Sequence, residues 1–189
     1  MPDRVKRTTA CAAIAVKLID GGPPFFYQDR AGRNGRRVSV PKIRTMILDA
    51  EKGLNDYLDA TPGAREEWET RHKLRNDPRL VPYVGQFFRR FSIDELPQLC
   101  TVVVGDMSLV GPRPFPDYHL RNFSPDFLEL RQRVRPGITG LWQVTVRSDG
   151  GIGEQEAYDS YYIRNWSVWL DLYLLSRTLA SVVSGRGAY

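Results

Sequence analysis

The stretch from Arg89 to Pro114 limits the fold most, because it combines a helix start, an apolar run and a rigid loop. Ser92 and Glu95 have the spacing of a capping box, in which each side chain bonds to the backbone of the other. Asp94 therefore stands beside Glu95 at a predicted helix start. Charged first turns are common, so structure alone accounts for both acids. A helix N-terminus also keeps a carboxylate ionised and can face a phosphate, so a nucleophilic role for Asp94 stays open.

An apolar run follows these acids. Its residues recur at helical spacing and predict a helix that buries one face: Leu96, Leu99, Cys100, Val103 and Val104. Pro97 is too deep for a comfortable first-turn position, so it predicts a kink or a late helix start near the carboxylates. Gly105 has the position of the residue that ends a helix in the left-handed conformation.

Cations recur around this stretch. Arg113 lies between Pro112 and Pro114, which fix the backbone and leave it little entropy to lose on binding. Lys42 and Arg44 have period two and share one strand face, which either is solvated or contacts phosphate. Further arginines concentrate before a Pro-Gly turn: Arg131, Arg133 and Arg135.

The net charge favours anionic partners. The 189 residues include 27 Lys and Arg against 22 Asp and Glu, which gives a net charge of +5 and a pI near 9.4. Phosphates, nucleic acid and acidic lipids are such partners. An apolar content of 42% fits one domain with a real core. Cys11 and Cys100 are expected to be small buried side chains, and two histidines give no zinc spacing.

The order of apolar and turn residues predicts an α/β fold of the α+β type, rich in helix, with a small sheet or hairpin. Phe25–Tyr27 and Val38–Val40 are expected strands on either side of a glycine-containing turn. Pro41 ends the second strand or restricts it to an edge. Charged amphipathic helices are expected at Asp49–Leu58 and Ala64–Leu74.

Two apolar segments bear on membranes. Thr8–Ile19 would form a helix of about 18 Å, too short for a hydrocarbon core of about 30 Å. A core helix is the default, and an interfacial helix or one arm of a re-entrant hairpin also fits. A second helix is expected at Ser167–Val183, where Trp166, Trp169 and Tyr173 suit either a bilayer interface or a core.

The chain resembles the bacterial sugar transferase family, the monotopic phosphoglycosyl transferases. These enzymes move a hexose-1-phosphate from a UDP-sugar to polyprenyl phosphate. The resemblance covers almost the whole length from Gly21 onward and is carried by motifs in a fixed order: Gly22–Gln28, Pro41–Glu51, Ser92–Leu99, Gly105–Pro114, Val134–Val144, Asp159–Ser167 and the terminal G-R-G-A-Y. So many ordered matches make coincidence remote and favour the catalytic role of Asp94.

The resemblance implies a ping-pong mechanism on an Asp-Glu dyad. Asp94 would attack the β-phosphate of the UDP-sugar, release UMP and carry the sugar phosphate until polyprenyl phosphate accepts it. The family's Mg²⁺ is carried over onto Glu95, since each displacement needs the phosphate charge neutralised. Lys42, Arg89 and Arg113 would clamp the diphosphate.

The remaining site residues implied by the resemblance are Arg44 and Arg135, as substrate contacts, and Asp159, near the metal or an arginine. Residues 1–20 would be the remnant of a re-entrant or interfacial membrane helix, and residues 21–189 the catalytic domain. The expected location is the cytoplasmic face of the bacterial inner membrane. Partners would be the UDP-sugar, polyprenyl phosphate, the membrane leaflet and a second copy in a homo-oligomer, without nucleic acid.

The chain departs from the family at its start, because only Thr8–Ile19 corresponds to the usual helix-break-helix hairpin. A truncated, catalytically silent homologue that acts as an interaction module is therefore an alternative, and a phosphosugar adduct on the purified chain would discriminate against it. A basic nucleic-acid-binding module is a second alternative. It predicts strongly salt-dependent binding to DNA or RNA.

Overall fold

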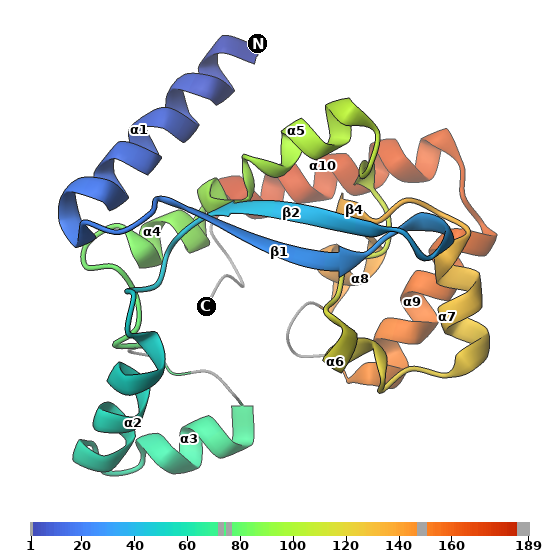
Figure 1. Ribbon diagram of the computed structural model, residues 1–189. Helices are drawn as coiled ribbons and strands as arrows, with labels where there is room; N and C mark the ends of the chain where they lie inside the picture. The colour runs from blue at the N-terminus through green and yellow to red at the C-terminus, as the bar shows by residue number, and fades with distance from the viewer. Residues whose placement is uncertain (1, 72–73, 75–76, 147–150, 185–189) are drawn as a thin grey trace. The chain divides into compact units, whose positions relative to one another are not determined.

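The computed structural model describes residues 2–71, 74, 77–146 and 151–184. Within these residues the chain forms two compact units, the first from residues 2–26 and 43–96 and the second from residues 27–42 and 97–184. Figure 1 gives the order of the elements along the chain. The terminal G-R-G-A-Y motif lies outside the described residues. The expected functional division at residue 20 stays a prediction.

The first unit contains helices α1 (Pro2–Asp20), α2 (Ala50–Ala60), α3 (Ala64–Arg71) and α4 (Gly85–Arg90) and the 3-10 turn η2 (Ile93–Glu95). Its main core joins Ala12 and Val16 of α1 to Ile43 and Phe88. This packing buries only part of the apolar surface of α1, since Ile14 is 58% and Leu18 80% exposed. Trp68 and Leu74 help to dock α2 and α3 on each other.

The predicted hairpin is formed by β1 (Phe25–Ala31) and β2 (Arg37–Ile43), joined by the 3-10 turn η1 (Arg33–Gly35). The strands are antiparallel, because Gly32 N–H donates to Arg36 O at 2.8 Å and Arg44 N–H to Pro24 O at 2.8 Å. The turn needs Asn34 at φ 55° and Gly35 at φ 71°, a region that these two residue types tolerate best. Pro41 is accommodated within β2 because each strand of a two-stranded sheet is an edge strand.

The second unit contains helices α5 (Gln98–Val104), α6 (Asp117–Leu120), α7 (Pro125–Gln132), α8 (Leu141–Thr145), α9 (Ile152–Arg164) and α10 (Val168–Ser184). Short strands β3 (Ser108–Val110) and β4 (Gly137–Thr139) pair in parallel. Helix α9 packs against α7 and α8, and α10 packs against α8 and both strands (Figure 1). Val110, Tyr162 and Leu174 form the core there. The helix-rich fold with small sheets is therefore confirmed.

The fold contradicts two expectations about exposure and decides a third that was left open. Helix α5 does not bury the predicted face, since Val103 is 87% and Val104 75% exposed. Both cysteines are exposed rather than buried. The aromatic residues at the start of α10 are also exposed, so the core interpretation of Trp169, at 80% exposure, is wrong. No described helix is long and apolar enough to cross a membrane.

Candidate active site

The two adjacent carboxylates lie on η2 in the first unit. Asp94 is only 9% exposed, and Glu95 is half-buried. The predicted capping box is wrong, because Ser92 has φ 52° and its side chain makes no cap hydrogen bond. The α-helix begins later, at Gln98, after Pro97 as the cap residue, so the late start predicted from Pro97 is confirmed.

Arg89 reaches this turn from the end of α4. Its Nε donates a hydrogen bond to the Thr45 hydroxyl at 2.9 Å. Burial lowers the pKa of Arg89, while the negative charges of Asp94 and Asp77 act in the opposite direction. The guanidinium stays charged at neutral pH, because an arginine side chain is not deprotonated in proteins. The first unit thus holds a buried carboxylate within the field of a half-buried cation.

Arg44 is engaged in structural contacts. Its Nε donates to Pro23 O at 2.7 Å, and Nη1 pairs with Asp20 and donates to Met46 O at 2.9 Å. These bonds tie the end of α1 to the segment after β2. A Cβ at Gly22 would lie 2.9 Å from Arg44 Nη2, so a side chain there would shift the guanidinium. The predicted substrate contact of Arg44 stays a prediction.

A cationic cavity of about 240 Å³ lies in the second unit. Three of its lining side chains are Arg30 from β1, Lys42 from β2 and Arg113 from the loop after β3. Burial lowers the pKa of Arg30, and the like charge of Arg113 lowers it further. Like charges that converge on one cavity are stabilised by a bound anion. The remaining lining residues are Val40, Gln98, Pro114, Phe115, Pro116, Tyr118 and His119.

Close backbone packing holds the loop that carries Arg113. Gly111 N–H donates to Thr139 O at 2.8 Å, and Gly137 N–H donates to Pro112 O at 2.9 Å. Side chains are excluded at this contact, since a Cβ on Gly137 would lie 2.1 Å from Gly111 N. A Cβ on Gly140 would lie 2.3 Å from Gly111 O. The glycines of the Gly105–Pro114 and Val134–Val144 motifs therefore fix the start of the loop.

A buried ion pair supports the same loop. Arg131 Nη1 lies 3.2 Å from Asp159 Oδ2, and its Nη2 donates to the backbone oxygen of Arg113. The Arg131 guanidinium also lies 4.9 Å from the centre of the Phe115 ring. Burial raises the pKa of Asp159 to about 6 although Arg131 opposes it. Burial likewise lowers the pKa of Arg131 to about 10, against the pull of Asp159.

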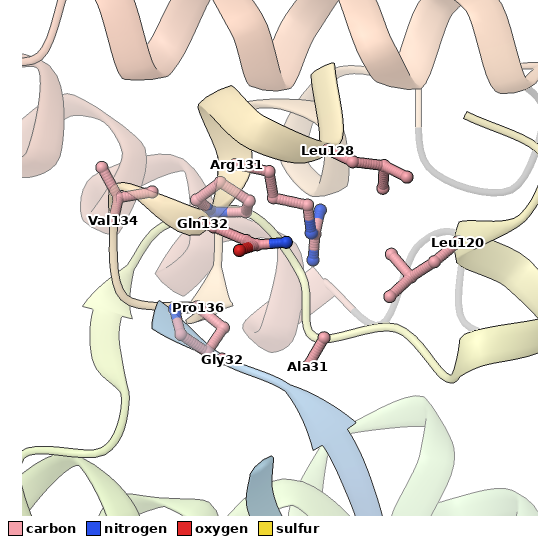
Figure 2. A pocket seen from close by; sticks show the side chains of 9 residues that line it. Ala31, Gly32, Leu120, Leu128, Arg131, Gln132, Val134 and Pro136 are labelled. Atoms are coloured by element: carbon pink, nitrogen blue, oxygen red, sulfur yellow. The ribbon is translucent and has the colours of Figure 1, made fainter. Parts of the chain in front are cut away.

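Figure 2 shows Arg131 among the residues that line a second cavity, with its side chain directed into it. This cavity has a volume of only about 30 Å³. It is too small for a substrate, since its volume is about an eighth of the 240 Å³ of the cationic cavity. We therefore assign the pair of Arg131 and Asp159 to support of the Arg113 loop.

Residues 5–185 match the bacterial sugar transferase family. The chain belongs to this family. The family predicted from the sequence is thereby confirmed, and with it the enzyme class at the level of the family. The matched residues include the carboxylate turn and the two glycine-rich segments whose packing is described above.

Some relatives in this family act on lipid carriers according to their names. The chain is 41% identical over 174 residues to the exopolysaccharide production protein ExoY of Sinorhizobium fredii, covering 92% of this chain and 76% of ExoY. It is 42% identical over 170 residues to the UDP-galactose-lipid carrier transferase of Erwinia amylovora, covering 90% of this chain and 35% of the relative. The UDP-glucose:undecaprenyl-phosphate glucose-1-phosphate transferase of Escherichia coli is 37% identical over 191 residues, with 95% and 37% covered. The chain thus spans about a third of the length of the last two relatives.

The predicted site residues of this sugar transferase fall into four groups. Asp94, Glu95 and Arg89 come together in the first unit, and Lys42 and Arg113 line the cationic cavity of the second. Asp159 was expected near the metal or near an arginine, and it lies beside Arg131. The last group does not join the cavity lining: Arg44 and the exposed Arg135.

Sequence reasoning missed Arg30, Thr45 and the support role of Arg131. For Arg30 a signal was present, because β2 alternates Val38, Val40 and Lys42 on one face and the hairpin sets β1 beside it. Thr45 and Arg131 carried no comparable signal, since their partners are far away in the sequence. Arg131 belongs to a cluster of arginines in the sequence, and their charge alone does not show which of them has a structural role.

The carboxylates of Asp94 and Glu95 suit the predicted Mg²⁺ ion. Among the described residues, no group of three or more His, Cys, Asp and Glu side chains could hold a metal. Mg²⁺ in phosphoryl-transfer sites is typically held by one or two carboxylates together with substrate phosphates and water. Two adjacent carboxylates, Asp94 and Glu95, fit that requirement, with Glu95 the better placed because Asp94 is more deeply buried.

Proposed function

We propose that this chain transfers a hexose-1-phosphate from a UDP-sugar to undecaprenyl phosphate and so starts assembly of an exopolysaccharide or related surface glycan. The observation that carries the proposal is its membership of the family, joined to a buried carboxylate within the field of Arg89. The names of relatives support the two substrates, since they include UDP-sugars, a lipid carrier and undecaprenyl phosphate.

Asp94 is the proposed nucleophile. One of its carboxylate oxygens bonds to the β-phosphorus of the UDP-sugar, and the bond from that phosphorus to the bridging oxygen breaks, so UMP leaves. The sugar phosphate is then held on Asp94 as an acyl phosphate. An oxygen of undecaprenyl phosphate attacks the same phosphorus, and the bond to Asp94 breaks. Two displacements through a covalent intermediate replace one direct reaction between two anions.

The cations supply the electrostatic part of this reaction. Phosphoryl transfer depends mainly on positioning and on neutralising the charge of the transferred group. Arg89 acts beside Asp94, and Lys42, Arg113 and Arg30 bind the diphosphate. Asp94 belongs to the first unit and Lys42 to the second, so their action on one substrate rests on the family. Mg²⁺ held by Glu95 would supply further charge neutralisation at the phosphates.

The membrane surface is the proposed location. Helix α10 exposes an apolar face without a described cover, and its aromatic residues suit the headgroup region. Its most exposed large side chains are Trp169 at 80%, Val183 at 79% and Leu179 at 67%. A relative named undecaprenyl-phosphate galactose phosphotransferase, from Salmonella typhimurium, must also meet a lipid substrate. This face would lie on the cytoplasmic leaflet, where undecaprenyl phosphate is reached.

One experiment tests the substrates, the nucleophile and the location. The chain is mixed with vesicles that contain undecaprenyl phosphate, Mg²⁺ and UDP-glucose or UDP-galactose, and UMP release and sedimentation with the vesicles are measured. Without undecaprenyl phosphate, UMP release should stop at about one molecule per chain, because the intermediate cannot turn over. Asp94→Asn should lower UMP release by about a thousandfold or more.

Asp56→Asn is the matched control, since Asp56 is an exposed acid on α2 in the same unit. It should release UMP at the rate of the unchanged chain. Equal release by Asp94→Asn would refute the nucleophile. No UMP from either sugar nucleotide would instead favour the silent homologue, and a chain that stays in the supernatant would refute the membrane location.

A further inference from the structure

Thr45 is a buried polar residue, 7% exposed, in the segment that follows β2. It belongs to the Pro41–Glu51 motif but has none of the roles assigned above to that motif. The residue before it, Arg44, is bound to the end of α1 and the loop after it. Thr45 points its hydroxyl elsewhere, to the Arg89 guanidinium.

The backbone of Thr45 is fixed from two directions. Val81 N–H donates to Thr45 O at 2.9 Å, and the next residue, Met46, forms an antiparallel bridge with Leu80. Helix α4 begins directly against the same carbonyl, since a Cβ on Gly85 would lie 2.7 Å from Thr45 O. Only a glycine lets the helix approach so closely. The position of the Thr45 side chain is therefore set by backbone contacts that do not involve Arg89.

The hydroxyl of Thr45 then sets the orientation of Arg89. Gly85 and Arg89 are four residues apart on α4, so both lie on the helix face directed at Thr45. Arg89 donates its Nε–H to Thr45 Oγ1 at 2.9 Å. A guanidinium held through Nε keeps the four N–H groups of Nη1 and Nη2 for other acceptors. Anchoring at Nε also removes rotational freedom that a long side chain would otherwise lose on binding.

We propose that Thr45 is a positioning residue for the transfer reaction, whose hydroxyl orients the Arg89 guanidinium toward Asp94 and the phosphate that Asp94 receives. This inference rests on the proposed function. Thr45 does not touch the substrate and acts only through Arg89. Its contribution is greatest when negative charge develops on the transferred phosphate, because a pre-oriented cation then needs no rearrangement.

A positioning role and a merely structural role predict different results for Thr45→Val. Valine has nearly the shape of threonine but accepts no hydrogen bond. If Thr45 only helps the unit to fold, Thr45→Val should lower the melting temperature and leave kcat of the folded chain unchanged. If Thr45 positions Arg89, kcat should fall by about tenfold, the effect expected for one hydrogen bond to a charged group.

The activity test compares Thr45→Val with Thr45→Ser and with Arg89→Lys. The serine variant keeps the hydroxyl and should recover most of kcat. In a chain that already carries Arg89→Lys, Thr45→Val should cost little more, because lysine has no Nε–H to anchor. Thr178→Val is the matched control, since it removes another partly buried threonine hydroxyl, in the second unit, and should leave kcat unchanged.

A second readout needs no turnover. In ¹⁵N-labelled protein, exchange of the Arg89 Nε–H with water should be slow in the unchanged chain and in Thr45→Ser, and fast in Thr45→Val. The Nε–H of exposed Arg90 provides the fast reference. If the unchanged chain is active and Thr45→Val keeps full kcat, the positioning role is refuted. If Arg89 exchanges as fast as Arg90 in the unchanged chain, the anchor itself is refuted, whatever the activity. Failure of the proposed function is seen separately, as absence of UMP release from the unchanged chain.

Discussion

The carboxylate turn and the Arg113 loop are held in different ways. The turn at Ile93–Glu95 is a single 3-10 turn that follows a serine in the left-handed region, at φ 52°. The loop after β3 begins in a parallel strand pair where backbone atoms meet without side chains between them. It is also bound by the buried pair of Arg131 and Asp159.

The difference indicates which interactions hold each region in its conformation. A left-handed serine stores a small amount of backbone strain, of the order of 1 kcal/mol or more, which the surrounding fold must offset. Side-chain bonds such as that between Arg89 and Thr45 do this in the first unit. The Arg113 loop instead depends on the backbone itself. We therefore expect single substitutions to disturb the loop much more than the turn.

Gly137→Ala should have the largest effect on stability. The added Cβ would lie 2.1 Å from Gly111 N and 2.6 Å from Thr139 O, so the strand pair must separate. We expect the free energy of unfolding to fall by more than about 3 kcal/mol, as backbone cannot yield as a side chain does. Urea denaturation followed by circular dichroism measures this change.

Gly153→Ala is the control for that substitution. Gly153 lies in α9, where an added Cβ would meet nothing within 4 Å, so alanine should stabilise the helix slightly. If the two alanine variants unfold at the same urea concentration, the close backbone contact does not hold the Arg113 loop.

Arg131→Met should have the next largest effect, and the effect should depend on pH. The substitution removes the bond to Arg113 O and leaves Asp159 buried without its cation. Breaking one side of a buried ion pair costs about 3 kcal/mol when the remaining group is charged. We therefore expect a loss of this size at pH 8. Urea denaturation at pH 4 and at pH 8 measures it.

The sign of the pH dependence follows from Asp159. Burial raises its pKa from the ordinary 3.8 to about 6, so the folded chain binds an extra proton between these values and stability falls as pH rises through this range. Without Arg131, burial acts alone and the pKa of Asp159 should rise further. The loss caused by Arg131→Met should therefore shrink toward pH 4, where Asp159 is neutral. A loss of equal size at both pH values would contradict the buried pair.

Arg133→Met provides a control from nearby in the sequence. Arg133 follows α7 and pairs with Glu129 at 2.8 Å on the surface, with both side chains more than half exposed. Exposed pairs contribute about 0–1 kcal/mol. The variant should unfold nearly as the unchanged chain does at either pH.

Local sequence patterns predicted several of the helices and strands well. The hairpin, the pair α2 and α3, and helix α10 follow from periodicity and turn residues. Gly105 ends α5 at φ 95°, as its position predicted. The sequence motifs also brought forward Asp94, Lys42 and Arg113 as candidate site residues, because carboxylates and cations near rigid turns suit phosphate chemistry.

What the patterns missed depends on partners far away in the chain. Ser92 and Glu95 have the spacing of a capping box, but the tight connection from α4 imposes a left-handed serine instead. Asp159 and Arg131 are 28 positions apart, and Arg89 and Thr45 are 44 apart, so no local spacing relates them. Helix α5 has apolar residues at helical spacing yet exposes Val103 and Val104, since periodicity does not say which face finds a partner.

Substitutions of Ser92 should have the smallest effect and give the finest test of the turn. In a capping box, Ser92→Ala would cost about 1 kcal/mol and Ser92→Gly only a few tenths. With φ 52° and no side-chain cap bond, alanine should change the free energy of unfolding by less than about 0.5 kcal/mol. Glycine should be neutral or slightly stabilising, because it adopts the left-handed region without strain. Urea denaturation ranks the three chains, and a clear loss for alanine with none for glycine would restore the capping box.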